Sequence, residues 1–441
     1  MEKKVKAITS RDVDFAKWYT DVVVKSGLAA YSNVRGCIYI PPYGTALWDL
    51  FKSEFDNKLK TLGYSNVMFP LLMPKSLLQK EKDHITGFSP EVATIAGEDP
   101  DPLLIRPTSE ALFCDYFAKN LQSYKELPLR LNQWANIVRL EKNTRPFLRT
   151  TEFFWQEGHA LFATEEEART EARKIHKLYE DFVRDLLAIP VVSGQKTESE
   201  KFAGAVDTYT IESMMYDGQA LQSATSHYLG DGFMRAFGVK VQGKEGEIYP
   251  HYVTFGITTR MIGGIVMVHG DDNGLVLPPR VAPTQVVLIP IKAVDVSGIK
   301  LPSIRFHVDN SDNSPGWKFA EYEMKGIPLR IEIGPRDLEA GDAIVSIRYS
   351  GEKRKIKIDD LPAAVPALLD EIHEAMYAAA KNRLDSSKSF IYAPWCGSEE
   401  CETNHKKKTG MGSRCIVGES KGKCVVCGKA GKHEVVWGRA Y

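Results

Sequence analysis

Arg139-Leu-Glu141 opens the most informative segment of the chain, which continues through a polar stretch, 142–148, into Arg149-Thr-Thr-Glu-Phe153-Phe-Trp-Gln-Glu157-Gly-His159. Its charged residues recur within segments that otherwise have the apolar character of strands. An arginine that faces a core is costly unless an anion pairs with it, and a phosphate or carboxylate ligand would do so through bidentate hydrogen bonds. A solvated strand face with surface ion pairs is the alternative that these residues alone leave open.

A second charged segment, Arg106-Pro-Thr-Ser-Glu110, directly precedes an apolar helical stretch, 111–117. Its simplest interpretation is a helix start, in which Thr108 caps the helix and Glu110 favours the positive helix end. A third region joins Gln222-Ser-Ala-Thr-Ser-His227 to Gly256-Ile-Thr-Thr-Arg260-Met-Ile-Gly-Gly264, a strand that ends in arginine before a helix of small residues. These residues also fit a purely structural role, in which His227 is a structural histidine and the two glycines before residue 265 permit close helix packing.

Around these segments, the first 280 residues have the pattern of one large α/β unit. Apolar residues recur at helical spacing from Leu47 to Leu62 and stop at Gly63, a favoured C-terminal residue of helices. The apolar run 67–73 contains Pro70, which predicts a strand at a sheet edge or one whose pairing is interrupted. A second helix is expected to begin at Thr164, because Glu167 completes a capping-box pattern.

The remaining chain divides at Leu277-Pro-Pro-Arg-Val-Ala-Pro283, whose three prolines favour a stiff link. Strands are expected at 286–291, 329–333 and 344–347 and a helix near 365–380, which predicts a small α/β domain over 284–375. The three predicted domains are therefore 1–280, 284–375 and 381–441.

The composition is that of a globular protein and disfavours nucleic-acid-binding proteins with an overall basic surface as well as membrane-spanning proteins. With 43% hydrophobic and 26% charged residues, the 441-residue chain has enough apolar material for a sizeable core. Its 57 basic and 57 acidic residues give no chain-wide basic surface for nucleic acid, so any RNA contact is expected to be local. The charged start Met1–Lys6 lacks the apolar region of a signal peptide, and no apolar stretch approaches the roughly 20 residues that cross a bilayer. We therefore expect a cytoplasmic protein with no membrane association.

Five of the seven cysteines crowd into the last fifty residues. Cys396, Cys401, Cys424 and Cys427 form a C-x₄-C … C-x₂-C pattern that suits a closed tetrahedral structural zinc site. Disulfides or idle thiols are the alternatives, and a reducing compartment disfavours the former. Cys37 and Cys114 are expected to be small core residues.

Taken together, these segments resemble the motifs of class II aminoacyl-tRNA synthetases, and specifically of prolyl-tRNA synthetases of the archaeal and eukaryotic type. The helix and strand ending at Pro70 match motif 1, which builds the dimer interface in that family. Motif 2 is matched by Arg139, Glu141, Arg149 and Phe153, motif 3 by Arg260, and the Thr-x-Glu loop of prolyl enzymes by Thr108 and Glu110. The resemblance runs from about residue 14 to Tyr441, a terminal tyrosine that in the family reaches toward the active site.

The resemblance implies an α/β (α+β) fold: a class II catalytic domain with a mainly antiparallel sheet flanked by helices, an α/β anticodon-binding domain and a small zinc-binding C-terminal domain. It implies a homodimeric proline–tRNA ligase that forms prolyl-adenylate from ATP, with Mg²⁺, and L-proline, and then acylates the 3′ end of tRNA(Pro). Expected catalytic residues are Arg139 and Arg260. Expected ATP contacts are Arg139, Glu141, Arg149, Thr150, Phe153, Gln222, Thr225, Thr258 and Arg260, and the expected proline pocket consists of Thr108, Glu110, Arg139, His227, Trp155, Glu157 and His159.

Several details of the sequence qualify this expectation. Arg149 and Arg260 are 111 residues apart, which leaves no room for the editing module that some bacterial prolyl enzymes carry there. Lys292–Ser303 is too short for the crossover helix of the family's anticodon-binding domain, so that domain looks trimmed unless residues have been omitted from the sequence.

Lys318 and Arg336 are candidates for RNA contacts, with surface salt bridges as the equal alternative. Cys415 is expected not to bind metal, as the family spacing suggests.

Two rival functions follow from the same motifs. A threonyl-tRNA synthetase would hold its substrate on a zinc ion with one cysteine and two histidines. Outside the C-terminal region, the chain offers only Cys37 and Cys114 for this role, and both lie outside the motif 2 and motif 3 segments. A catalytically silent synthetase-like protein would be expected to lose motif residues that are intact here. Both rivals are therefore disfavoured.

Overall fold

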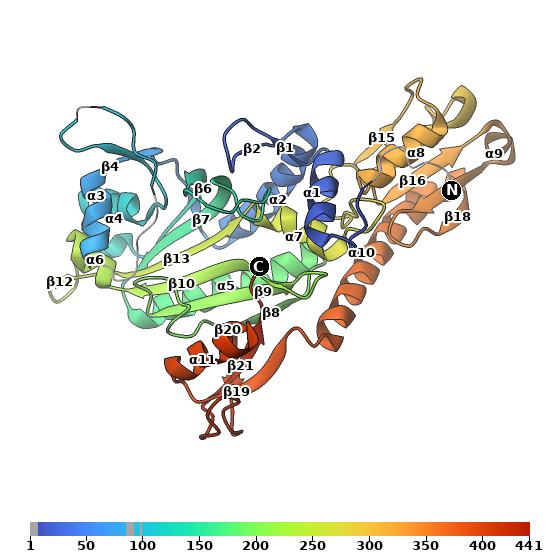
Figure 1. Cartoon of the computed structure of the whole chain (residues 1–441). Helices are drawn as coiled ribbons and strands as arrows, with labels where there is room; N and C mark the ends of the chain where they lie inside the picture. The colour runs from blue at the N-terminus through green and yellow to red at the C-terminus, as the bar shows by residue number, and fades with distance from the viewer. Residues whose placement is uncertain (1–7, 85–91, 98) are drawn as a thin grey trace.

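A computed structural model describes residues 8–84, 92–97 and 99–441, with the side chains of 81–84 and 293 left aside. Figure 1 shows a large central unit, an α/β unit at one end and a small C-terminal module below the central sheet. The charged N-terminal residues Met1–Lys6 lie outside the described part. Among the described residues, no helix has the length and apolar character needed to cross a membrane.

The centre of the molecule is a ten-stranded sheet in the order β19-β21-β20-β8-β9-β10-β13-β7-β6-β3. Its neighbours pair antiparallel except at one edge, where β3 runs parallel to β6. The catalytic-unit strands are β3 (Ser65–Asn66), β6 (Leu129–Val138), β7 (Glu152–Phe162), β8 (Val191–Gln195), β9 (Asp207–Met214), β10 (Ala220–Gly230) and β13 (His251–Thr258). The predicted mainly antiparallel sheet flanked by helices is confirmed.

Two long helices cover one face of this sheet. Helix α2 (Pro42–Thr61) and helix α5 (Glu165–Leu187) meet through aromatic side chains, with the Phe55 and Tyr179 rings stacked 5.2 Å apart. Thr164 caps α5 and completes the capping box, as its sequence predicts. The other helices of this unit are α1 (Phe15–Lys25), α3 (Lys75–His84), α4 (Glu110–Asn120), α6 (Gly232–Phe237) and α7 (Arg260–His269), and its small strands are β1 (Ala30–Tyr31), β2 (Ile38–Tyr39), β4 (Leu72–Pro74), β5 (Leu103–Ile105), β11 (Val241–Gln242) and β12 (Glu247–Ile248).

The apolar run 67–73 is not one strand. Residues 67–71 separate β3 from β4, whereas Leu72 and Met73 belong to β4, and several backbone groups between the two strands bond to side chains instead of a ladder. The Phe69 N–H donates to Gln133 Oε1 at 2.6 Å, and the Arg106 guanidinium donates to the carbonyls of Phe69 and Pro70 at 3.0 and 3.2 Å. The strand pairing is therefore interrupted at Pro70, as expected. The Arg106 guanidinium bonds to the backbone carbonyls that this interruption leaves unpaired.

The interval between motifs 2 and 3 is filled by elements of the central unit itself. Strand β7, helix α5, strands β8 to β10, helix α6 and strands β11 to β13 occupy the residues between Arg149 and Arg260. Most of these strands belong to the central sheet.

The second unit is a five-stranded sheet in the order β15-β14-β16-β17-β18 with helices on its faces. Residues 294–305, between the parallel strands β14 and β15, form no helix; instead Val296 and Leu301 are buried in the same cluster as Val286. The short link thus closes the core where the family would place a crossover helix. The elements are β14 (Val286–Pro290), β15 (Phe306–Val308), α8 (Pro315–Met324), β16 (Leu329–Ile333), α9 (Pro335–Ala340), β17 (Asp342–Ile347), β18 (Lys353–Lys357) and α10 (Leu361–Ser386).

A partly buried ion pair joins this unit to the end of the motif 3 helix. Arg348 donates to both carboxylate oxygens of Asp271, at 2.8 and 2.6 Å, and Asp271 follows α7 by two residues. Burial alone would raise the pKa of Asp271, but the hydrogen bonds and charge of Arg348 outweigh it and lower that pKa. The two units are therefore held by a charged contact in addition to backbone bonds such as Leu275 N–H to the Met324 carbonyl.

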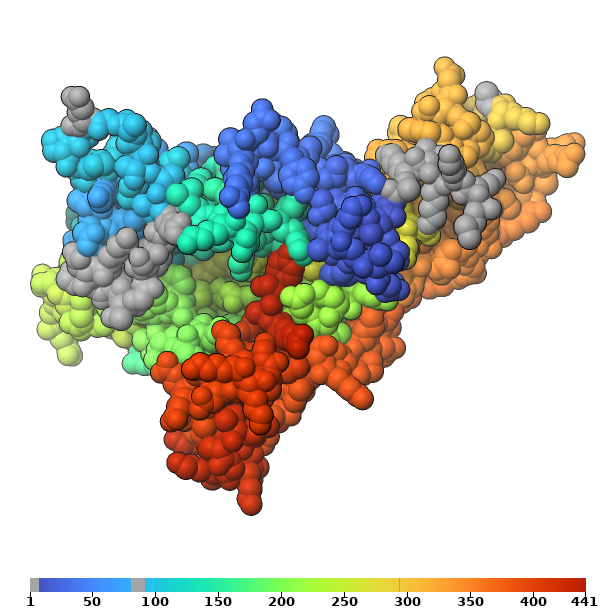
Figure 2. All heavy atoms as spheres, viewed as in Figure 1, coloured from blue at the N-terminus to red at the C-terminus, as the bar shows by residue number. Residues whose placement is uncertain are grey.

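The C-terminal module (residues 391–441) extends the central sheet instead of standing apart from it. Its strand β20 pairs with β8 through Ile416 and Gln195. Figure 2 shows the last residues leaving this module and entering the central unit, where the Tyr441 N–H donates to the Ala220 carbonyl at 2.9 Å and the Tyr441 ring lies 5.3 Å from the Arg145 guanidinium. The module contains β19 (Ile391–Trp395), α11 (Glu399–Thr409), β20 (Gly412–Glu419) and β21 (His433–Gly438).

Candidate active site

One cavity of about 300 Å³ opens on the central sheet, between the motif segments. Every residue that the sequence analysis placed in the ATP or proline site lines it. These residues are Thr108, Glu110, Arg139, Glu141, Arg149, Thr150, Phe153, Trp155, Glu157, His159, Gln222, Thr225, His227, Thr258 and Arg260. Segments separated by up to about 150 positions of sequence thus meet around one volume.

Strand alternation explains why these side chains share a face. Phe153, Trp155, Glu157 and His159 are alternate residues of β7, so all four project to one side of the sheet. His159 lies opposite Thr254 of β13, which lies opposite His227 of β10, so the three form a row across neighbouring strands. The next row is Glu157, Gly256 and Thr225.

Three arginines give the cavity its positive end. Arg139 donates to the Pro107 carbonyl through Nε at 2.8 Å, and Arg260 donates to the Leu148 carbonyl through Nε at 3.1 Å, which leaves other N–H groups for a ligand. Burial lowers the pKa of Arg260, and the neighbouring charges of Arg149 and Arg139 lower it further. The guanidinium groups are therefore close enough to repel one another, as expected of an anion site.

The acidic groups of the cavity differ in how they are satisfied. Glu157 accepts hydrogen bonds from Ser109 Oγ at 2.6 Å and Gln133 Nε2 at 2.7 Å, and its other oxygen lies 3.0 Å from His159 Nε2. Within the described part of the chain, the hydrogen bond found for the Glu110 carboxylate comes from the Thr108 hydroxyl. Glu110 is only 4% exposed, so it is a buried carboxylate with capacity for a cationic ligand. Thr108 does not cap α4, whose N-cap residue is Ser109.

His227 forms part of an apolar wall beside these carboxylates. Its Nδ1 lies 2.9 Å from Thr208 Oγ1, and its ring packs 4.6 Å from the ring of Phe202. Burial lowers the pKa of His227 to about 3, so the imidazole stays neutral at physiological pH. This residue is suited to close a pocket around an apolar group.

Two buried polar atoms in the lining lack a protein partner among the described residues, namely Trp155 Nε1 and Thr254 Oγ1. Such atoms are uncommon in native interiors and are expected to have a ligand or water as partner. The sequence analysis did not identify several lining residues, among them Thr254, Lys196, Glu200, Phe202 and Thr208. Strand alternation on β9 and β13 was the available signal for Thr208 and Thr254, whereas the other named residues lie in a loop without a recognisable motif.

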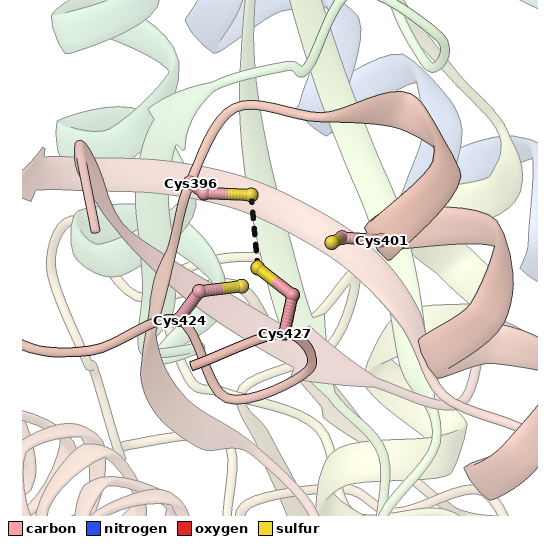
Figure 3. Close-up of side chains that lie close together, drawn as sticks. All are labelled: Cys396, Cys401, Cys424 and Cys427. Atoms are coloured by element: carbon pink, nitrogen blue, oxygen red, sulfur yellow. Dashed lines mark hydrogen bonds between the residues drawn. The ribbon is translucent and has the colours of Figure 1, made fainter. Parts of the chain in front are cut away.

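The four cysteines of the C-terminal module form a second candidate site (Figure 3). Their sulfur atoms all lie within 4.8 Å of one another, and those of Cys427 and Cys396 are 3.8 Å apart. Four thiolates at about 2.3 Å from a tetrahedral zinc would be about 3.8 Å apart, so the donor set fits this ion. Cys415 is buried outside the cluster. Cys114 is a core residue as expected, but Cys37 is only half-buried.

Comparison with known proteins agrees with this geometry. Residues 94–269 match the family described as tRNA synthetase class II core domain (G, H, P, S and T), residues 285–368 match the anticodon binding domain, and residues 377–441 match the C-terminal domain of prolyl-tRNA synthetase. The fold and the cavity thus define a class II aminoacyl-tRNA synthetase.

More specific relatives cover the whole chain. A proline–tRNA ligase of Clostridium botulinum (strain Loch Maree / Type A3) is 49% identical, over 100% of this chain and 99% of the relative. A crystal structure of prolyl-tRNA synthetase from Cryptosporidium parvum, complexed with L-proline and AMP, is similar with a TM-score of 0.93 and 38% identity, covering 99% of this chain and 97% of that one. The same enzyme with halofuginone and AMPPNP gives the same values. The chain belongs to the prolyl-tRNA synthetase family of proline–tRNA ligases.

The chain is shorter than its alignment with these relatives. The alignment with the Clostridium botulinum protein extends over 474 positions, 33 more than the 441 residues here. The relative therefore contains residues that this chain lacks.

Proposed function

We propose that the cavity activates L-proline with ATP, and that the three arginines hold the phosphates. The supporting observation is the convergence of Arg139, Arg149 and Arg260 on one volume, where the charges of Arg149 and Arg139 help to lower the pKa of Arg260. Attack of a carboxylate on the α-phosphate brings two anions together, so catalysis consists mainly of positioning and charge neutralisation. In this proposal Arg139 bridges the α-phosphate and the proline carboxylate, Arg149 binds the γ-phosphate, and Arg260 contacts the phosphates and stacks on adenine.

The adenine and ribose contacts follow from the remaining lining residues. Phe153 is assigned to the opposite face of adenine, and Glu141 to its amino group. The hydroxyl and amide groups assigned to hydrogen bonds with the nucleotide are those of Thr150, Gln222, Thr225 and Thr258. Mg²⁺ accompanies ATP and supplies further neutralisation of phosphate charge when bound, mainly through phosphate oxygens. The carboxylates of Glu141 and Glu200 in the lining are oxygen donors of the type that this ion prefers.

The proline pocket is assigned to the acidic end of the cavity. Glu110 and Thr108 receive the secondary ammonium of proline, because the Glu110 carboxylate is buried and not already saturated by protein donors. Neutral His227 closes on the pyrrolidine ring. Trp155, Glu157 and His159 form the far wall, which is stiffened by the stacking of His159 on Phe113 at 3.6 Å.

The second half-reaction transfers the prolyl group to the 3′ end of tRNA(Pro). We assign residues 1–280 to catalysis, 284–375 to anticodon binding and 381–441 to the zinc-binding domain, although α10 runs continuously through the second boundary. Lys318 is not available to RNA, because it is buried and its Nζ donates to the Asp309 carbonyl at 2.9 Å. Exposed Arg336 keeps its assignment to RNA.

A homodimer in the cytoplasm completes the proposal. The segment between β3 and β4, at the edge of the central sheet, leaves large apolar side chains in solvent, with Met68 96% exposed and Leu71 39% exposed. A second copy of the chain would cover them, since isolated proteins rarely leave such side chains grouped at a sheet edge.

The test of the proposed reaction is amino-acid-dependent pyrophosphate exchange with each of the twenty amino acids. We expect a signal with proline, with weak signals at most from alanine and cysteine, because a difference of about one methylene is worth only about 1–3 kcal/mol of discrimination. The cavity lining of the described residues contains His159 and His227 but no cysteine, so the zinc site of a threonyl enzyme is not expected. A signal with threonine, or with none of the twenty, would contradict the proposal.

Metal analysis of the purified protein is expected to find about one zinc per chain, because the four thiolates fit one tetrahedral ion. Cys424→Ser and Cys427→Ser should each remove most of this zinc, since each deletes one of four ligands. Cys415→Ser is the matched control, because Cys415 is a buried cysteine of the same module outside the cluster. Zinc that persists in both ligand variants would refute the assignment of the thiolates.

A further inference from the structure

The wall loop (residues 196–202) forms one side of the active-site cavity, between β8 and β9. Three of its residues line the cavity, namely Lys196, Glu200 and Phe202. Lys196 is anchored within the central unit, with its Nζ 2.7 Å from Glu212 Oε1. At the other end of the loop, the Phe202 N–H donates to Thr208 Oγ1 at 3.0 Å. The position of this loop therefore shapes the cavity.

Phe202 connects the wall loop to the proposed proline pocket. Its ring packs against His227, and the Thr208 hydroxyl that accepts from its backbone also lies within hydrogen-bond distance of His227 Nδ1. A displacement of the loop would thus move the ring contact of His227 and disturb the hydroxyl that orients its imidazole. The pyrrolidine side of the pocket depends on these two contacts, whereas the nucleotide side is built mainly from β7, β10, β13 and α7.

The C-terminal module contacts the wall loop near its start, at Thr197. The Thr197 hydroxyl donates to Glu402 Oε1 at 2.8 Å, and the Ser413 hydroxyl donates to the same oxygen. Thr197, Glu402 and Ser413 are all at most 6% exposed. Glu402 belongs to α11 and Ser413 to β20, so residues more than 200 positions away in sequence hold the loop.

The charge of Glu402 makes this contact strong. A hydrogen bond to an ionised carboxylate in a buried site is stronger than one between neutral groups. The other oxygen of Glu402 has no hydrogen-bond partner among the described residues, so the carboxylate relies on these hydroxyls. Two cations of the module lie beside the loop residue Glu200, with Arg414 at 3.7 Å and Lys406 at 3.9 Å.

We propose that Glu402 is a positioning residue for the proline pocket, and that the C-terminal module serves the known reaction by holding the wall loop in place. No residue of the module (391–441) lines the cavity, so the module acts through Thr197, the wall loop, Phe202 and His227. This inference rests on the proposed assignment of His227 to the proline pocket. It gives the module a role in substrate binding that a purely stabilising domain would not have.

The experiment compares Thr197→Val with Thr197→Ser in the full-length enzyme. Valine has nearly the shape of threonine but cannot donate to Glu402, whereas serine keeps the hydroxyl. In pyrophosphate exchange, Thr197→Val is expected to raise the KM for proline about tenfold, as for the loss of one hydrogen bond to a charged group. The KM for ATP and kcat should change less than about twofold, because the phosphate contacts lie elsewhere. Thr197→Ser should restore the proline KM.

A second measurement follows the wall loop directly. Hydrogen–deuterium exchange at residues 196–202 is expected to be faster in Thr197→Val and in Glu402→Gln than in the wild type, without a matching change in β6 or β7. Glu198→Gln is the matched control, because Glu198 is an exposed residue of the same loop whose ion-pair partner is Lys201 and not Thr197 or Glu402. The double variant Thr197→Val/Glu402→Gln should be no worse than the more affected single variant, since both break one contact.

The outcomes separate this inference from the proposed function. Thr197→Val with a wild-type KM for proline and wild-type amide exchange would overturn the inference, and so would a raised KM that Thr197→Ser fails to restore. Equal losses in the KM for proline, the KM for ATP and kcat would assign the contact a structural role and also overturn it. If the wild-type enzyme shows no exchange with proline, the proposed function fails, and the amide exchange of 196–202 still decides whether Glu402 holds the loop.

Discussion

Replacement of Arg139 by alanine is expected to reduce proline-dependent pyrophosphate exchange by about a thousandfold or more. Removing one preorganised donor from a developing charge costs about 10²–10³ in rate, and Arg139 is assigned to both reacting anions. Its guanidinium is oriented by the bond from Nε to the Pro107 carbonyl and by the aromatic rings of Phe153 and Trp155 at 5.6 and 5.9 Å. Lysine at this position should recover little activity, because it cannot make the forked contact.

The control for this variant is Arg173→Ala on the exposed face of α5, which removes the same charge far from the motif segments. It should leave exchange near the wild-type value. Arg139→Ala should retain the thermal stability of the wild type, since burial lowers the pKa of Arg139 and its cationic form is costly to keep in place without substrate. Near-normal exchange in Arg139→Ala would remove this residue from its assigned role.

Local sequence signals predict the elements that frame the site. The capping box at Thr164 places the start of α5, and Gly63 places the end of α2, because caps and hydrophobic periodicity act within a few residues. Strand β16 coincides with the predicted range 329–333 for the same reason, since its apolar residues alternate with polar ones. The arrangement of these elements into one cavity depended on the resemblance to a known family.

What the sequence did not predict depends on contacts between distant segments. The extension of the central sheet by the C-terminal module rests on the pairing of Ile416 with Gln195, for which neither residue carries a pattern. The wall loop was missed for a related reason, because Lys196 and Phe202 are held at the cavity by Glu212 and Thr208, residues of a later strand. The run 67–73 was predicted as a strand because its apolar residues outweigh Pro70; its backbone partner, Arg106, is more than thirty residues away.

Lys318 shows how burial decides between two uses of a charge. In sequence it was equally suited to contact RNA or to form a surface salt bridge. The fold places it under 5% exposed with its Nζ 3.3 Å from Asp309 Oδ1. Burial alone would raise the pKa of Asp309, but the hydrogen bonds from Ser311, Tyr322 and Lys318 lower it to about 2. This ion pair stabilises the second unit and is buried, so Lys318 is not on the surface. The order of charged residues along the sequence does not show which of them are buried.

Replacement of Glu110 by glutamine is expected to raise the KM for proline by about 10- to 100-fold, the effect of losing a charged hydrogen bond of about 1.5–3 kcal/mol. Glutamine keeps the shape and one acceptor oxygen, so the bond from the Thr108 hydroxyl is retained. What is lost is the negative charge that faces the secondary ammonium. The KM for ATP should change much less, because Glu110 is assigned to the secondary ammonium of proline and to no contact with ATP. Steady-state exchange over a range of proline concentrations measures both values.

The informative control is Glu157→Gln, because the two carboxylates share the cavity but differ in their partners. Glu157 already accepts from Ser109 and Gln133 and lies beside His159, so an amide there would set an N–H group against existing donors. Glu157→Gln should therefore lower thermal stability, whereas Glu110→Gln should leave it close to that of the wild type. If Glu110→Gln destabilises the protein and leaves the KM for proline unchanged, Glu110 is a structural residue, and the ammonium of proline must be received by another group in the cavity.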